Sequence, residues 1–283
     1  MSFMEKVSNL DRRWIFMIIA LAVAIPLVFP FSMHVKVSEH VQTVFEALEE
    51  IPEGATVLCS FEYGPSTMPE VHPMSRAVLN YLMQRNDKVI VMALWPDGLF
   101  MSRDILDEVC ERKYGREYGV DYINLGYKAG NEVVIKSVVE SFYTTYPVDT
   151  RGRALSSYPI MHGIENLANI DFIFSFSAGY PGTIEWVQYA ADTLNKPMST
   201  GCTAVQVTEV VPFVQSGQCM GILGGLSGAA EFEKLLMDKG YMKELGAGNR
   251  GMAAQSVAHL VMVLFIIIGN VSYYLDRRRQ RKY

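Results

Sequence analysis

The sequence predicts an α/β fold, with a doubly wound, mainly parallel sheet domain flanked by N- and C-terminal transmembrane helices. Six short apolar runs alternate with amphipathic helical patterns, which is typical of a parallel sheet covered on both faces. The run 89–94 is continuously apolar, as a strand buried on both sides requires. Two long uncharged stretches, near the two ends of the chain, predict the flanking helices.

The first uncharged stretch covers 18 residues, from Trp14 to Phe31. At about 1.5 Å per residue, a helix of this length approaches the roughly 30 Å hydrocarbon core of a bilayer. We therefore expect a transmembrane helix over 14–32, preceded by a cytoplasmic tip at 1–13. A cleaved signal peptide ending near Ala24 is the alternative, but the apolar run continues beyond that position.

The second uncharged stretch covers 19 residues, from Val257 to Leu275, and predicts another transmembrane helix. It follows a membrane-proximal connector at 241–256 and precedes a basic tail at 276–283. Because Lys and Arg collect on the cytoplasmic side of short flanks, the basic residues beside both stretches place both termini in the cytoplasm. We expect a two-pass protein of the cell membrane with an extracytoplasmic central domain.

The central part of the chain is strongly acidic. Residues 14–275 carry 17 basic and 27 acidic side chains, a net charge of −10. Such a domain repels polyanions, so we expect the lipid bilayer and other protein subunits as partners and no nucleic acid.

The central elements follow in a regular order. An amphipathic stem occupies 33–54, because Val41, Val44, Phe45, Leu48 and Ile51 share one helical face. The α/β domain then spans 55–240. Its expected strands are 55–61, 88–95, 121–126, 171–176, 197–202 and 218–224, and its expected helices are 74–85, 102–113, 132–143, 184–194 and 229–239.

The four cysteines are Cys59, Cys110, Cys202 and Cys219, and no two lie close enough in sequence for metal-ligand spacing. Two disulfides are possible in an oxidising compartment, but Cys59 and Cys110 fall in apolar patterns that favour buried free thiols. Cys202 ends one strand and Cys219 begins the next. In a parallel sheet these ends are far apart, so we expect no bridge between them.

Ligands of parallel sheets bind beyond the carboxyl ends of the strands, and glycine-rich segments follow several of these strands. The backbone at a glycine approaches a ligand closely, and free N–H groups at a helix start favour anions. Tight strand-to-helix turns need glycine for purely structural reasons as well. The spacing matches neither the dinucleotide fingerprint nor the Walker A motif. The candidate ligand-binding residues are Ser177, Gly179, Gly182, Thr183, Gly224, Gly225, Ser227, Lys128 and Asn131.

Catalysis is an alternative at the same edge. Ser177 lies one glycine short of a Gly-x-Ser-x-Gly elbow, and a Ser177–His72–Asp97 arrangement is topologically possible. Glu62 and Asp97 are carboxylate candidates. Glu62, Glu70 and His72 are an alternative set of metal ligands, but a solvated turn fixed by Pro69 and Pro73 is the favoured explanation, and we expect no metal site. The sequence identifies no cofactor.

Three segments resemble an uncharacterised family of prokaryotic membrane proteins with two terminal transmembrane helices around an α/β domain. They are Leu-Asp-Arg-Arg-Trp-Ile-Phe at 10–16, Tyr-Gly-Val-Asp-Tyr-Ile-Asn-Leu-Gly-Tyr at 118–127 and Gly-Gly-Leu-Ser-Gly-Ala-Ala-Glu at 224–231. The resemblance implies this architecture and assigns no activity or site.

The pattern as a whole predicts an extracytoplasmic α/β binding or assembly module. Because only short segments remain on the cytoplasmic side, we expect it to act within a homo-oligomer or with other membrane subunits. The alternative is an extracytoplasmic hydrolase or transferase that uses Ser177 or the Glu62/Asp97 pair. Whether any reaction is catalysed is left open by the sequence.

Overall fold

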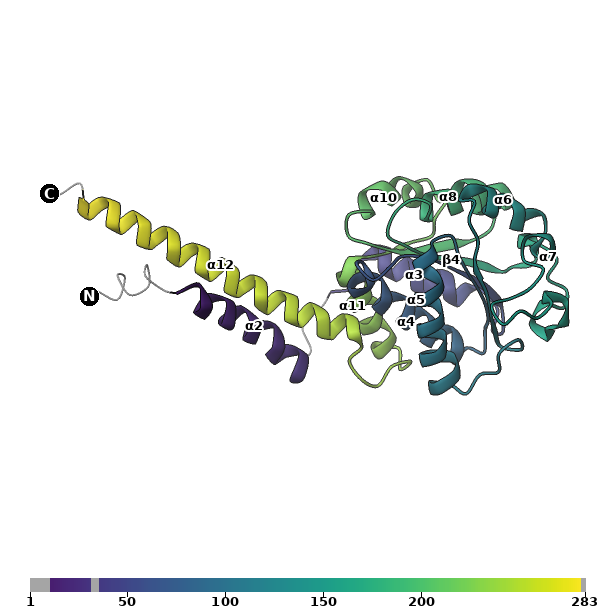
Figure 1. The fold of residues 1–283 in the computed structure, drawn as a ribbon, viewed down its shortest axis with the longest axis horizontal. Coiled ribbons are helices and arrows are strands. Elements are labelled where there is room, and N and C mark those ends of the chain that lie inside the picture. The colour runs from purple at the N-terminus through teal and green to yellow at the C-terminus, as the bar shows by residue number, and fades with distance from the viewer. Residues whose placement is uncertain (1–10, 32–35, 281–283) are drawn as a thin grey trace. The chain divides into compact units, whose positions relative to one another are not determined.

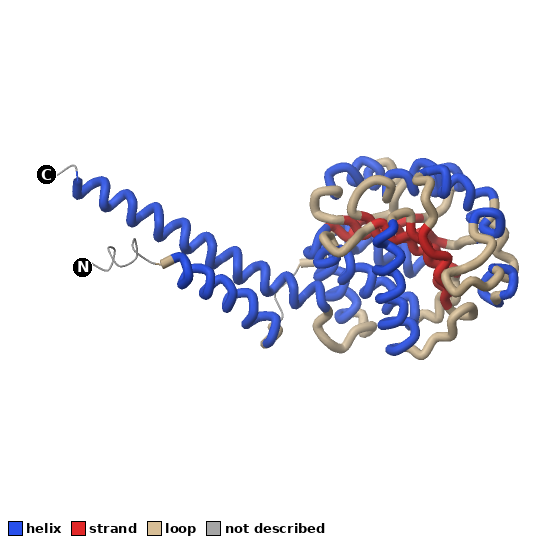
Figure 2. Tube along the Cα trace, viewed as in Figure 1, coloured by secondary structure: helices blue, strands red, loops and turns tan. Residues whose placement is uncertain are grey.

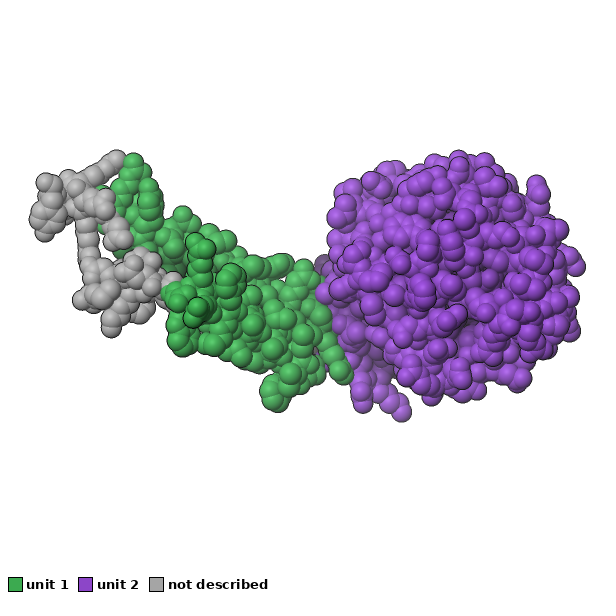
Figure 3. Space-filling model, viewed as in Figure 1, with its two compact units in different colours: residues 1–34, 249–283 green, residues 35–248 purple. Residues whose placement is uncertain are grey.

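The computed structural model describes residues 11–31 and 36–280. The chain divides into two compact units, one of residues 35–248 and one of residues 1–34 with 249–283 (Figure 3). The larger unit holds the whole sheet and all of the candidate site residues.

The larger unit is built on a six-stranded, fully parallel sheet with the strand order β3-β2-β1-β4-β5-β6. Helices lie on both faces of this sheet (Figures 1 and 2). The predicted α/β class is therefore confirmed. The strands are β1 (Thr56–Glu62), β2 (Lys88–Ala93), β3 (Tyr122–Tyr127), β4 (Phe172–Ser177), β5 (Met198–Cys202) and β6 (Ile222–Gly224).

Two hydrophobic layers sandwich the sheet because successive side chains of each strand point to opposite faces. In β1, Val57, Cys59 and Phe61 join one layer, whereas Leu58 joins the other. The first layer packs under α3 (Glu39–Glu50), α4 (Met68–Gln84), α5 (Pro96–Leu106), η1 (Asp107–Lys113) and α11 (Gly225–Asp238).

The opposite layer contains α6 (Glu132–Glu140), α7 (Phe142–Thr145), α8 (Thr183–Trp186) and η5 (Val187–Ala191), which α9 (Asp192–Leu194) continues. Three short helical turns complete it: η2 (Leu155–Ser157), η3 (Pro159–Met161) and η4 (Leu167–Asn169). The helix α10 (Val207–Gln215) covers the β5–β6 end through Val210.

The stem helix α3 is fastened to the sheet domain by a buried ion pair. The Arg85 guanidinium donates from Nε to Asp87 Oδ2 at 3.0 Å, and from its terminal nitrogens to the carbonyls of Leu48 and Ile51. Asp87 Oδ1 accepts from the Gly54 and Ala55 N–H groups. The end of α3 and the start of β1 are thus held by one charged pair.

The smaller unit contains α2 (Arg12–Val28) and most of α12 (Ala247–Gln280). Among the described residues, one segment, Ala247–Leu275, is long and apolar enough to cross a membrane. Its 29 residues would extend about 43 Å at 1.5 Å per residue. The C-terminal span is therefore supported, and it starts ten residues earlier than the expected 257.

Among the described residues, no N-terminal segment is long and apolar enough to cross a membrane, so the expected span at 14–32 is not supported. The helix α2 has 17 residues and ends at Val28, shortly after Pro26, so it would extend only about 26 Å. Proline at that position removes a helical N–H and precedes the helix end. Residues 1–10 of the expected tip, residue 32 of this span and residues 281–283 of the tail lie outside the described residues.

All four cysteines are free and buried. Cys202 and Cys219 are therefore not bridged in the structure. Burial raises the pKa of the Cys202 and Cys219 thiols to about 12, and the neighbouring Cys219 raises that of Cys202 further, so both remain protonated at neutral pH.

Candidate functional site

The chain order of the strands reverses between β1 and β4. The connection after β1 runs through α4 on one face of the sheet, and the connection after β4 runs through α8 on the other. Open parallel sheets bind their ligands at this switch point, beyond the carboxyl ends of the strands. Glu62 ends β1 and Ser177 ends β4, and these two residues are partners in register.

Glu62 is fully buried at this switch point. Burial raises the pKa of its carboxyl to about 8, although hydrogen bonds partly offset the increase. Ser60 Oγ donates to Oε1, and Ser175 Oγ lies 3.5 Å from Oε2. The carboxyl is therefore mainly protonated at neutral pH, and it can both donate and accept a hydrogen bond.

A chain of buried hydroxyl groups extends from Glu62 across the sheet. Ser175 Oγ lies 3.3 Å from Thr183 Oγ1, which lies 2.6 Å from Thr200 Oγ1. Thr200 in turn donates to the Ser175 carbonyl at 2.9 Å. A hydroxyl can donate and accept at once, so this chain connects β1, β4, α8 and β5 through polar contacts inside an otherwise apolar layer.

Two further buried polar groups lie near Glu62 and make no hydrogen bond of ordinary geometry among the described residues. Among the described residues, the Tyr146 hydroxyl and Trp186 Nε1 are buried and make no hydrogen bond. Burial, followed by the Glu62 charge, raises the pKa of Tyr146. The Trp186 N–H points a partial positive charge at the Glu62 carboxyl and so lowers its pKa. The geometry of this contact lies outside that of an ordinary hydrogen bond. Buried donors of this kind are costly unless water or a ligand satisfies them.

The loop after β4 is tightly packed at the carboxyl end of the sheet. A Cβ at Gly182 would lie 2.0 Å from Ser177 Oγ and 2.3 Å from the Gly179 carbonyl oxygen. Trp95 Nε1 donates to the Pro181 carbonyl at 2.9 Å, and the Trp95 ring lies 3.3 Å from where a Gly179 Cβ would be. The glycines thus allow the loop to pack on itself and on Trp95.

The loop after β1 meets the start of α5 on the other side. A Cβ at Gly64 would lie 2.8 Å from Asp97 Oδ2, and one at Gly98 would overlap the Phe61 carbonyl oxygen. Asp97 is exposed in the first turn of α5. This turn therefore carries an exposed carboxylate, Asp97, whereas Glu62 at the end of β1 is fully buried.

The structure does not bring Ser177, His72 and Asp97 together as hydrogen-bonded partners. Ser177 Oγ donates to the Gly179 carbonyl at 3.1 Å. The His72 ring, on α4, shares a hydrogen bond with the Tyr63 hydroxyl at 2.9 Å, and its Nε2 lies 3.7 Å from Asp104. Burial lowers the pKa of His72 to about 4, so the ring is neutral at pH 7.

The second glycine-rich loop is explained by packing. A Cβ at Gly224 would lie 2.6 Å from Val207, and one at Gly225, where φ is +58°, would lie 2.9 Å from Ala204. Ser227 donates to Glu231 at 2.9 Å. These contacts account for the glycines without any ligand.

Lys128 and Asn131 lie in the exposed loop after β3. Lys128 Nζ donates to the Thr145 carbonyl at 2.6 Å and lies 5.7 Å from the centre of the Tyr146 ring. Asn131 precedes α6 with a φ of 51°. Lys128 therefore contacts Tyr146, which in turn interacts with Glu62. The left-handed backbone of Asn131 indicates a structural role in the turn before α6.

Within the described residues, no group of three metal-ligating side chains is positioned to hold a metal ion. Glu70 accepts a hydrogen bond from the Ala204 N–H at 3.0 Å, and His72 is occupied by Tyr63. Glu62 belongs to the opposite layer.

No family model matches this chain, and no curated protein is significantly similar to it. The fold and the site define the class instead: an α/β protein with a doubly wound parallel sheet, a candidate membrane-spanning helix and a buried polar site at its switch point.

Sequence reasoning named Glu62 but missed Tyr146, Trp186, Ser175 and Thr200. These residues come from four distant segments, and no motif connects them. The alternation of polar and apolar residues in Phe-Ile-Phe-Ser-Phe-Ser at 172–177 is the available signal, because a strand buried on both faces should not contain serines at 175 and 177 without partners.

Proposed function

We propose that this chain is a membrane-anchored α/β binding module that takes a small polar ligand at the β1/β4 switch point. The observation that carries the proposal is the fully buried Glu62, protonated at neutral pH, beside two buried donors, Tyr146 and Trp186, that make no hydrogen bond of ordinary geometry among the described residues. A neutral carboxyl surrounded by hydroxyl groups suits a ligand whose contacting part carries hydrogen-bond donors and acceptors but no net charge.

The module would lie outside the cytoplasm, anchored by α12 and by the apolar segment at 14–32. The basic residues beside both segments support this orientation through the bias of Lys and Arg to the cytoplasmic side. The net charge of −10 in the central region also disfavours contact with anionic lipid headgroups.

Exposed apolar side chains around the carboxyl edge of the sheet support assembly with another subunit. Tyr127 ends β3, Tyr180 lies in the loop after β4, and Val205 follows β5; Val205 is 82% exposed. Exposed apolar side chains along this edge support an interaction surface there. We propose that a second copy or another membrane subunit covers this edge.

A hydrolase or transferase remains the second candidate because of one observation. The raised pKa of Glu62 is the property that a general acid at neutral pH needs. Binding is favoured over catalysis because Ser177 is held by its own loop and its hydroxyl makes no hydrogen bond to His72 or Asp97 among the described contacts.

The experiment is native purification of the full chain in mild detergent, followed by mass spectrometry of co-purifying small molecules. A small molecule should accompany the wild type and be lost from Glu62→Leu. The neutral isostere Glu62→Gln should retain part of it, and the exposed control Glu209→Gln should retain all of it. Ligand-free wild-type protein, or equal recovery from Glu62→Leu, would contradict the proposal.

A further inference from the structure

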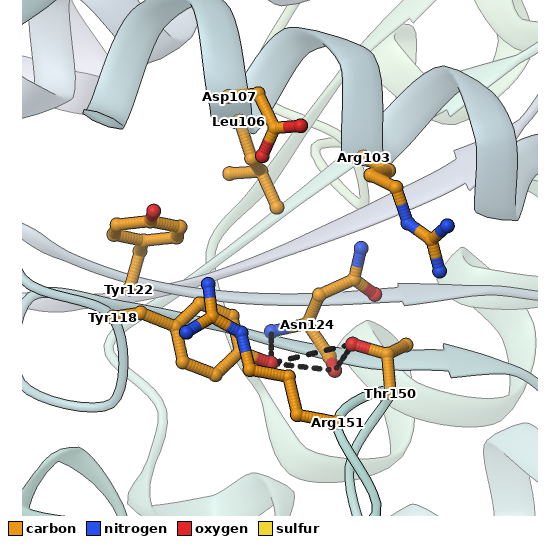
Figure 4. A pocket seen from close by; sticks show the side chains of 8 residues that line it. All are labelled: Arg103, Leu106, Asp107, Tyr118, Tyr122, Asn124, Thr150 and Arg151. Carbon is orange, nitrogen blue, oxygen red and sulfur yellow. Dashed lines mark hydrogen bonds between the residues drawn. The ribbon is translucent and has the colours of Figure 1, made fainter. Parts of the chain in front are cut away.

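A second cavity, of about 250 Å³, lies beyond the edge strand β3 and apart from the Glu62 site (Figure 4). One wall is formed by the helix that runs from α5 into η1, and the other by the loop 149–153. The cavity is lined by Arg103, Leu106, Asp107, Tyr118, Tyr122, Asn124, Thr150 and Arg151.

The loop that forms the second wall is rigidly built around Asp149. Its Oδ1 accepts from the N–H groups of Arg151 and Arg153, each at 3.0 Å. Its Oδ2 accepts from the hydroxyls of Tyr118 and Tyr158, at 2.7 and 2.6 Å. Four backbone and side-chain groups are thereby fixed in one geometry, so the backbone of Arg151 is positioned before any ligand arrives.

Thr150 fastens the same loop to the sheet. Its N–H and its hydroxyl both donate to the Asn124 carbonyl, at 3.2 and 3.0 Å. The Tyr118 hydroxyl reaches the same strand at Asn124. These contacts also satisfy polar groups on the outer edge of β3, which would otherwise be open.

The cavity presents two guanidinium groups with free hydrogen-bonding capacity. Arg151 stacks over the Tyr118 ring at 3.5 Å from its centre, which leaves the N–H groups at the edge of the guanidinium available. Arg103 projects from the opposite wall (Figure 4). Among the described residues, neither guanidinium donates a side-chain hydrogen bond or forms an ion pair.

Asp107 adds one acceptor to the same cavity, on the helical wall beside Leu106 (Figure 4). Burial raises the pKa of Tyr122, so its hydroxyl stays protonated and remains a donor. The site thus offers donors for an anionic group and one carboxylate for a hydrogen-bond donor, between aromatic and aliphatic walls.

We propose that this cavity binds a small carboxylate that also carries an ammonium or hydroxyl group, the class of amino and hydroxy acids. The guanidiniums of Arg103 and Arg151 hold the carboxylate, as guanidinium–carboxylate geometry favours. Asp107 accepts from the second group. The volume lies below the usual 300–1,000 Å³ of drug-sized sites, which restricts the ligand to a compact molecule. This inference is independent of the proposed function.

Calorimetric titration of the full chain in detergent tests the proposal with four probes: L-serine, L-lactate, acetate and inorganic phosphate. L-serine and L-lactate should bind at least about tenfold more tightly than acetate, which gives Asp107 no donor, since a hydrogen bond to a charged group is worth about 1.5–3 kcal/mol. No heat with any probe, equal affinity for acetate and L-serine, or tightest binding of phosphate would overturn the assignment.

Variants locate the binding within the molecule. Arg103→Gln and Arg151→Gln should each weaken L-serine binding about tenfold or more, and Asp107→Asn should abolish the preference over acetate. Arg153→Gln is the matched control, because Arg153 lies in the same loop but stacks on Tyr158 outside the cavity. If Arg153→Gln weakened L-serine binding as much as Arg151→Gln, binding would depend on the overall positive charge of the loop and not on the cavity, which would overturn the proposal. All of these side chains are exposed, so the fold should be retained.

Discussion

Glu62 and Ser177, the terminal residues of β1 and β4, are paired in register at the point where the strand order of the sheet reverses. The two positions differ in what surrounds them. The Ser177 hydroxyl is occupied by its own loop, whereas the Glu62 carboxyl lies near two buried donors, Tyr146 and Trp186, that make no hydrogen bond of ordinary geometry among the described residues. The polar site of this protein is therefore centred on Glu62.

The first prediction concerns stability between pH 5 and pH 8. Because the folded-state pKa of Glu62, about 8, exceeds its unfolded value, the folded state binds more protons in this range. The free energy of unfolding of the wild type should therefore fall as the pH rises, by up to about 1.4 kcal/mol per pH unit from this group. Glu62→Gln should remove this component, measured by denaturant unfolding in detergent. Parallel pH dependences of wild type and variant would contradict the prediction.

His72 should act in the opposite direction at lower pH. Its folded-state pKa, about 4, lies below its unfolded value of 6.5, so the unfolded state binds more protons between these limits. Stability from this group is present above pH 6.5 and is lost as the pH falls towards 4. Relative to His72→Gln, the wild type should lose stability over that interval. His162→Gln serves as the control, and a difference between wild type and His72→Gln that stays constant from pH 6.5 to pH 4 would refute this assignment.

Gly182→Ala should be strongly destabilising. The added Cβ would overlap Ser177 Oγ and the Gly179 carbonyl oxygen, so the loop after β4 would have to move. We expect a loss of about 1–3 kcal/mol, the range for overpacking. Gly179→Ala is the matched control in the same loop, because its Cβ would meet only the Trp95 ring at 3.3 Å. Equal midpoints for the two variants in thermal unfolding would show that the loop adjusts freely.

The Arg85–Asp87 pair should be essential for docking of the stem helix. Arg85→Met leaves the Asp87 carboxylate buried without its charge partner and frees two carbonyls of the α3 end. The expected cost is about 3–5 kcal/mol, because one partner of a buried pair is removed. Arg76→Met breaks the half-exposed Arg76–Glu108 pair and should cost about 1 kcal/mol or less. Similar losses in the two variants would contradict the assigned role of Arg85.

Orientation is testable because the four native cysteines are buried. An engineered Gln215→Cys, at the exposed end of α10, would be the accessible thiol of the folded sheet domain. A membrane-impermeant thiol reagent should label it in intact cells, and Gln215→Ser should stay unlabelled. Labelling that requires lysis would place the domain in the cytoplasm and rule out the proposed topology.

The sequence predicts most of the fold because its signals are local. Each expected strand overlaps an observed one, since short apolar runs bounded by turns suffice to place them. The helix α4 begins at Met68 rather than 74, because Pro69 lies in the first turn, where its missing N–H costs little. The helix α10 was missed because Pro212 and its many valines oppose helical propensity, and packing of Val210 against the β5–β6 end overrides it.

The site is less predictable because its contacts are not local. Glu62 could be named from its position after a strand, but the buried groups that interact with it, Trp186 and Tyr146, are far away in the sequence. The cavity beside β3 likewise depends on Asp149, whose four hydrogen bonds hold a loop that the sequence pattern leaves irregular.

The most direct test of the central claim is an infrared titration of the Glu62 carboxyl, taken as the difference between wild type and Glu62→Gln. A protonated carboxyl band should be present at pH 6 in the wild type and should disappear with a midpoint near pH 8. A band that is already absent at pH 6, with a midpoint near that of an exposed glutamate, would show a solvated, ionised Glu62 and contradict the account.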